Sequence, residues 1–112
     1  MEMQNLPNNV ISVKLSSSEK KISDELKELN ESISQQSNVD VIIDFSNVEI
    51  INSSNISNLL ILRGFVEKNR HRLFFYNVQT ITRCIFVVAG LTDSFIFIDD
   101  LEDTLKAVQN SV

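Results

Sequence analysis

Three short polar residues, Asn52, Ser53 and Ser54, stand at the start of a segment rich in leucine and isoleucine. Side chains of this kind often cap a helix, because their oxygens accept hydrogen bonds from its unpaired N–H groups. A serine in the first helical turn can also carry a phosphate, since the same N–H groups and the positive end of the helix dipole tolerate negative charge. The run therefore predicts either a helix cap or a phosphorylation site.

Residue patterns that support catalysis or cofactor binding are missing from the sequence. Cys84 and His71 are the only cysteine and histidine, so the usual zinc-binding sets cannot form. Only two glycines occur, Gly64 and Gly90, and neither belongs to a glycine-rich phosphate-binding loop. We therefore expect a protein that is not an enzyme and that uses no metal ion or other cofactor.

The composition is that of a small acidic protein. The 112 residues include 15 acidic and 10 basic side chains, which gives a net charge of -5. The acidic excess argues against nucleic acid as a partner, because phosphates attract a basic surface. No apolar run approaches the about 18 residues that span a membrane, and the first residues lack a signal sequence. Membrane insertion is not expected, and the predicted location is cytoplasmic.

The hydrophobic pattern alternates between strand-like and helix-like segments. Short runs rich in β-branched and aromatic residues predict strands at residues 10–15, 39–45, 72–76 and 95–98. Apolar residues at helical spacing predict helices over residues 16–34, 52–69, 80–89 and from residue 99 onward. Alternation of this kind places consecutive strands parallel in one sheet. We predict an α/β fold with a mostly parallel sheet and about four flanking helices.

Three local expectations follow from the same pattern. Residues 1–9, rich in asparagine, are expected to be a flexible arm before a single domain over residues 10–112. Ser16 followed by Glu19 predicts a capping box at the start of the first helix. An apolar stripe on the third helix is predicted to pack in the core; it consists of Ile81, Cys84, Ile85 and Val88.

The turn from Asp44 to Ser54 is the expected location of the functional site. It follows a buried strand, and parallel sheets bind ligands and partners beyond the carboxyl ends of their strands. Asp44 is expected either to accept backbone hydrogen bonds at the strand end or to face a partner. Ile56, near the start of the following helix, is expected to contact a partner.

Residues 43–54, the leucine-rich helix after them and the Ala89-Gly90-Leu91 segment resemble the STAS domain of bacterial anti-sigma factor antagonists. In that family, a hydrophobic-Asp-hydrophobic-Ser-x-Val pattern is followed by Asp-Ser-Ser-Gly, and the second serine accepts phosphate from a partner kinase. The matching serine here is Ser54. Asn52 and Asn55 stand where the family usually has Asp and Gly, so the site lacks a carboxylate and gains a side chain.

The resemblance implies a STAS-type fold and a function in protein binding. The unmodified protein would bind an anti-sigma factor serine kinase and so release a sigma factor. Phosphorylation of Ser54 would switch this off, and a serine phosphatase would restore it. The residues expected at the partner-binding surface are Asp44, Asn52, Ser53, Asn55 and Ile56. The alternative is a STAS subunit that packs permanently against a transporter or another scaffold and is never phosphorylated.

Overall fold

The computed structural model describes residues 1–36, 38–102 and 105–106. The elements whose two ends both lie in the described residues are five strands, three α-helices and a 3-10 turn, η1, before the last strand. In chain order the elements are β1 (Glu2–Leu6), β2 (Val10–Lys14), α1 (Glu19–Gln35), β3 (Asp40–Asp44), α2 (Ser53–Lys68), β4 (Leu73–Tyr76), α3 (Thr80–Val88), η1 (Thr92–Ser94) and β5 (Ile96–Ile98). The predicted α/β class is confirmed.

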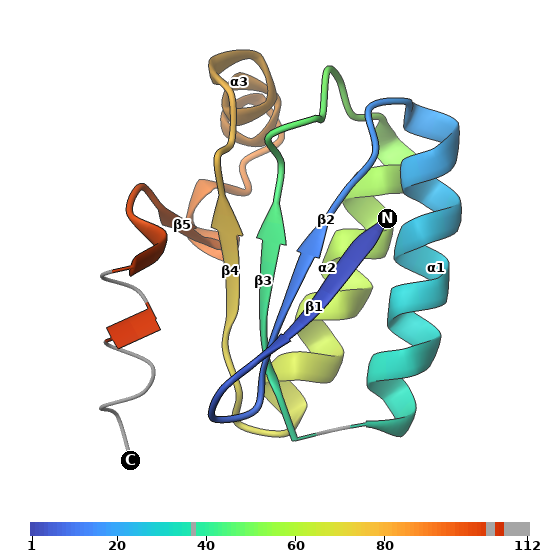
Figure 1. Cartoon of the computed structure of the whole chain (residues 1–112). Coiled ribbons are helices and arrows are strands. Elements are labelled where there is room, and N and C mark those ends of the chain that lie inside the picture. Colours follow the sequence, from blue (N-terminus) through green and yellow to red (C-terminus); the bar gives the residue numbers. More distant parts are fainter. Residues whose placement is uncertain (37, 103–104, 107–112) are drawn as a thin grey trace.

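The five strands lie side by side in the order in which they occur along the chain (Figure 1). β1 runs antiparallel to β2, and every other neighbouring pair is parallel. α1 and α2 lie together on one face of the sheet (Figure 1). As a result, the carboxyl ends of β2, β3 and β4 and the first turns of both helices lie at the same edge of the molecule.

Aromatic side chains fix α3 at that edge. The ring of Phe86, which is fully buried, lies 5.5–6.4 Å from the rings of four other phenylalanines. Two lie in β4 and β5, one follows β3 and one precedes β5; in chain order they are Phe45, Phe75, Phe95 and Phe97. Because aromatic rings bury a large area each, this cluster decides which side of α3 faces the core.

Residues 2–6 form an edge strand, whereas the composition predicted a flexible arm. β1 pairs with β2 along its whole length, so that Met3 lies opposite Val13. The connecting turn contains Asn8 and Asn9, whose φ angles are 65° and 59°. Asparagine tolerates this left-handed conformation better than most residues do. Two of the three asparagines that suggested a loose segment therefore form the turn of a hairpin.

α1 begins three residues after the predicted start. Its N-cap is Ser18, whose Oγ accepts a hydrogen bond from the backbone N–H of Lys21 at 3.3 Å. Ser16 instead binds the buried carboxylate of Glu25, to which the N–H and the hydroxyl of Ser16 donate hydrogen bonds at 2.9 and 2.7 Å. Glu25 also contacts the ammonium group of Met1. One buried carboxylate thus connects β1, the end of β2 and α1.

The fourth predicted helix falls largely outside the described residues. Residues 101–102 and 105–106 are helical, and residues 103–104 and 107–112 are not described. Leu101 and Leu105 pack on the sheet face opposite α1 and α2, against a small cluster formed by Val10, Ile42 and Phe74.

The contacts of Glu25 predict a pH-dependent stability. Burial raises the pKa of this carboxyl, but hydrogen bonds from the N-terminal ammonium and from Ser16 outweigh that effect, so its pKa lies below the usual 4.5. A carboxyl whose pKa is lower in the folded chain stabilises the fold above its unfolded pKa, and this stabilisation is lost as the pH falls. We expect Glu25→Gln to lower the free energy of unfolding near neutral pH, and the difference from wild type to shrink below pH 4.5.

Urea unfolding at a series of pH values from about 7 to about 3 measures this difference. Glu28→Gln is the matched control, because Glu28 is exposed on the same helix. If the two variants respond to pH in the same way, the carboxylate of Glu25 does not make these contacts in solution.

Candidate functional site

The turn after β3 ends in a capping box at the start of α2. Asn52 is the N-cap residue, and its Oδ1 accepts a hydrogen bond from the backbone N–H of Asn55 at 2.8 Å. In return, Asn55 Oδ1 accepts one from the backbone N–H of Asn52 at 3.0 Å. This pair satisfies two N–H groups that the helix start would leave without a partner. The predicted helix cap is confirmed for Asn52.

Asn55 is buried between α1 and α2, with 0% of its surface exposed. Its Nδ2 donates to the backbone oxygen of Glu19 at 3.2 Å and to Ser23 Oγ at 2.8 Å. The amide can be buried because its oxygen and nitrogen both have partners. The expectation that Asn55 adds a side chain to a docking surface was therefore wrong: this side chain joins two helices.

Ser53 and Ser54 are both exposed in the first turn of α2. The Oγ of Ser54 accepts a hydrogen bond from Ser23 Oγ at 3.4 Å, and its backbone oxygen accepts one from Asn58 Nδ2 at 3.0 Å. The Ser54 hydroxyl thus lies beside α1 but remains open to solvent. A second protein can reach it.

A carboxylate from α1 lies next to the cap. Asn52 Nδ2 donates to Glu19 Oε2 at 3.1 Å. Negative charge is therefore present beside position 52, although the residue at that position is neutral. Sequence reasoning missed this contact because Glu19 lies 33 residues earlier in the chain, and only the fold brings the two helix starts together.

Asp44 accepts a backbone hydrogen bond, which was one of its two expected roles, and its expected contact with a partner stays a prediction. Its Oδ1 accepts a hydrogen bond from the backbone N–H of Ser46 at 2.8 Å and a longer one from Asn77 Nδ2 at 3.4 Å. These contacts tie the end of β3 to the loop that follows β4. The carboxylate of Asp44 stabilises the turn leading toward α2, but its hydrogen bonds do not include residues 52–55.

An apolar groove with a volume of about 570 Å³ lies between the start of α2 and α3. Ile81 and Val88 on its α3 side are 64% and 88% exposed. The sequence predicted this stripe of α3 to be buried, but the core side of α3 carries Thr82 and Phe86, because Phe86 joins the aromatic cluster. We call this surface the apolar groove; its main lining residues are Ser53, Ile56, Ile81, Cys84, Ile85 and Val88.

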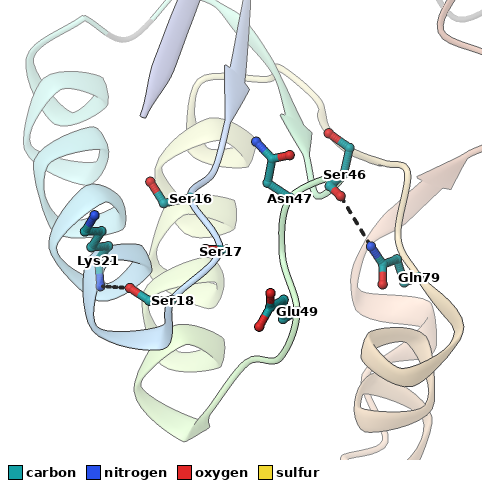
Figure 2. A pocket seen from close by; sticks show the side chains of 8 residues that line it. All are labelled: Ser16, Ser17, Ser18, Lys21, Ser46, Asn47, Glu49 and Gln79. Carbon is teal, nitrogen blue, oxygen red and sulfur yellow. Dashed lines mark hydrogen bonds between the residues drawn. The ribbon is translucent and has the colours of Figure 1, made fainter.

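A polar groove of about 730 Å³ opens at the same edge of the sheet, between the start of α1 and the loop after β3 (Figure 2). Lys21 and Glu49 contribute opposite charges to it, and Gln79 Nε2 closes one side by donating to the backbone oxygen of Ser46 at 3.3 Å. Its remaining walls are mostly serine hydroxyls. Ser54 does not line this groove.

We also searched the described residues for metal-binding clusters and for membrane-spanning helices. Within them, no three His, Cys, Asp or Glu side chains come close enough together to hold a metal ion. None of the helices in the described part of the chain is both long and apolar enough to cross a membrane.

Comparison with known proteins identifies the fold. The model of the STAS domain family matches residues 18–107. No curated protein matches the sequence. Among solved structures, the protein TM1081 from Thermotoga maritima, a candidate anti-sigma factor antagonist, superposes with a TM-score of 0.82 at 10% identity, over 97% of this chain and 94% of that one. An anti-sigma factor antagonist from Mycobacterium paratuberculosis gives 0.73 at 22% identity, over 97% and 92%.

The chain is also similar to the anti-sigma factor antagonist SpoIIAA, in both its unphosphorylated and its phosphorylated form. Its unphosphorylated form gives a TM-score of 0.74 at 12% identity, covering 99% of this chain and 98% of that one. The phosphorylated form from Bacillus gives 0.72 at 15% identity, covering 95% and 97%. At these identities, the structural comparisons establish a shared fold.

The hydrogen bonds of Asn55 in the capping box and to α1 predict that this residue stabilises the fold. Asn55→Ala removes the acceptor of the Asn52 N–H, and it leaves the backbone oxygen of Glu19 and the hydroxyl of Ser23 without this donor. We expect a loss of about 1–3 kcal/mol in the free energy of unfolding, measured by urea unfolding. Ser57→Ala, at an exposed position on the same helix, is the control and should change stability little. Equal stability of the two variants would contradict the buried role of Asn55.

Proposed function

Because the chain belongs to the STAS domain family, we propose that it is an anti-sigma factor antagonist whose binding to an anti-sigma factor serine kinase is switched off by phosphorylation of Ser54. The observation that carries this proposal is the exposed Ser54 hydroxyl in the first turn of α2, one residue from the apolar groove. The protein acts by binding and is the substrate of phosphorylation, not an enzyme.

The apolar groove supplies the binding energy in this proposal. Its exposed isoleucine and valine side chains gain free energy when a partner covers them, at about 25 cal/mol for each Å² of apolar surface removed from water. None of its lining residues carries a formal charge at neutral pH. A partner can therefore cover the groove without desolvating a charged group.

Phosphorylation of Ser54 changes this balance. A phosphate adds about -1.5 to -2 charges at neutral pH beside the groove. A kinase that covers Ser54 would then have to remove water from a dianion, which is costly without a paired cation. The fold need not change, because the phosphate stands at the positive end of α2. The switch acts through charge at the interface.

Glu19 supports the same assignment. The family's usual aspartate at position 52 is absent, but the Glu19 carboxylate, bound to Asn52, keeps a negative group at the cap. A kinase that recognises an acidic group next to the serine would find one here. The relatives also fit, since SpoIIAA exists in both unphosphorylated and phosphorylated forms. A cytoplasmic kinase and an opposing serine phosphatase are the partners that this cycle requires.

Substitution of Ser54 tests the proposal. Immobilised wild-type protein should capture an ATP-binding anti-sigma factor from an extract of its own cells, and that purified kinase with Mg-ATP should phosphorylate Ser54, as mapped by mass spectrometry. Ser54→Asp should weaken kinase binding by about tenfold or more, because it places a carboxylate at the interface. Calorimetry measures the two affinities.

Ser57→Asp is the matched control, since it adds the same charge one residue position beyond the first turn of the same helix. It should bind the kinase with nearly the wild-type affinity. An unmodified Ser54 beside a kinase that is active on another substrate would reject the switch. Undiminished binding of Ser54→Asp to a transporter or scaffold protein would instead support the permanent-subunit alternative.

A further inference from the structure

Ser23 on α1 contacts the proposed phosphate acceptor directly. Its Oγ donates a hydrogen bond to Ser54 Oγ at 3.4 Å. The same Oγ accepts a hydrogen bond from Asn55 Nδ2 at 2.8 Å. Because Asn55 is fully buried and also bonded to the backbone of Glu19, the Ser23 hydroxyl is held from the core side by a fixed group.

These contacts favour one orientation of the Ser54 hydroxyl. A hydroxyl group has one proton and two lone pairs. Since Asn55 donates to Ser23 Oγ, the proton of Ser23 is available to Ser54, whose oxygen uses one lone pair to accept it. If Ser23 donates in this way, the proton of Ser54 is left for an acceptor other than Ser23. The O···O distance exceeds the usual about 2.7–2.8 Å, so the contact orients Ser54 without holding it tightly.

We propose that Ser23 is a positioning residue for phosphoryl transfer to Ser54, an inference that rests on the proposed function. In the transfer, Ser54 Oγ forms a bond to the γ-phosphorus of ATP on the kinase. The bond from that phosphorus to the bridging oxygen breaks, and ADP leaves. The Ser54 proton passes to a basic group of the kinase. Ser23 takes no proton; it directs the attacking oxygen, and alignment of this kind accelerates transfer.

The contact between Ser23 and Ser54 depends on Asn55, which holds the Ser23 hydroxyl. A glycine, which is usual in the family at this position, has no side chain and could not hold Ser23. The residue that departs from the family pattern is therefore the one that holds Ser23, and Ser23 in turn contacts the Ser54 hydroxyl. Loss of Ser23 leaves Asn55 with its bonds to Glu19 and Asn52, so we expect Ser23→Ala to fold.

The first test needs no kinase. Three-bond couplings between the Hα and Hβ protons of Ser54, measured by NMR on the free protein, report whether its side chain occupies one rotamer. We expect one dominant rotamer in wild type, averaged couplings in Ser23→Ala, and couplings restored toward wild type in Ser23→Thr, which keeps the hydroxyl. Ser57→Ala is the control and should leave them unchanged. Averaged couplings in wild type, or unchanged couplings in Ser23→Ala, overturn the proposal.

The second test uses the anti-sigma kinase with Mg-ATP. Ser23→Ala should lower kcat for phosphorylation of Ser54 by about 3- to 10-fold with little change in KM, as expected for one hydrogen bond that aligns the acceptor. Ser23→Thr should recover most of the rate. Equal rates in wild type and Ser23→Ala overturn the role of Ser23 and leave the proposed function intact. Absence of phosphate on wild-type Ser54 rejects the proposed function, while the NMR couplings still decide the orientation of Ser54.

Discussion

The buried amide of Asn55 holds the first turns of α1 and α2 together, and the geometry of the site depends on it. It bonds to the backbone of Asn52 within α2 and to Glu19 and Ser23 on α1. An unpaired buried amide group costs about 1–3 kcal/mol, so the position that satisfies all three contacts is strongly favoured. A single side chain therefore sets where a carboxylate and a hydroxyl of α1 stand relative to Ser54.

The aromatic cluster makes a second constraint with a functional result. Phe86 turns α3 so that its aromatic side chain faces the core and its small aliphatic side chains face outward. The exposed stripe then meets the start of α2 and completes the apolar groove. Packing inside the molecule thus creates the apolar surface outside it. The hydrocarbon surface lies next to a modifiable hydroxyl because both occupy the edge where the parallel strands end.

The sequence was sufficient for the order and class of the elements, because strand and helix periodicities differ clearly over residues 10–98. It was also sufficient to select Asn52 as a cap, since capping depends on neighbouring residues. Contacts between distant residues were beyond its reach. The burial of Asn55 depends on α1, the exposure of Cys84 depends on where four phenylalanine rings gather around Phe86, and the pairing of β1 depends on a free sheet edge.

The spatial order of the strands repeats their order along the chain. No strand has to be inserted between two that have already paired, so each new strand adds at the same growing edge. Among the described residues, the two borders of the sheet are therefore β1 and β5, so the backbone groups that a neighbouring chain could pair with belong to the first and the last strand.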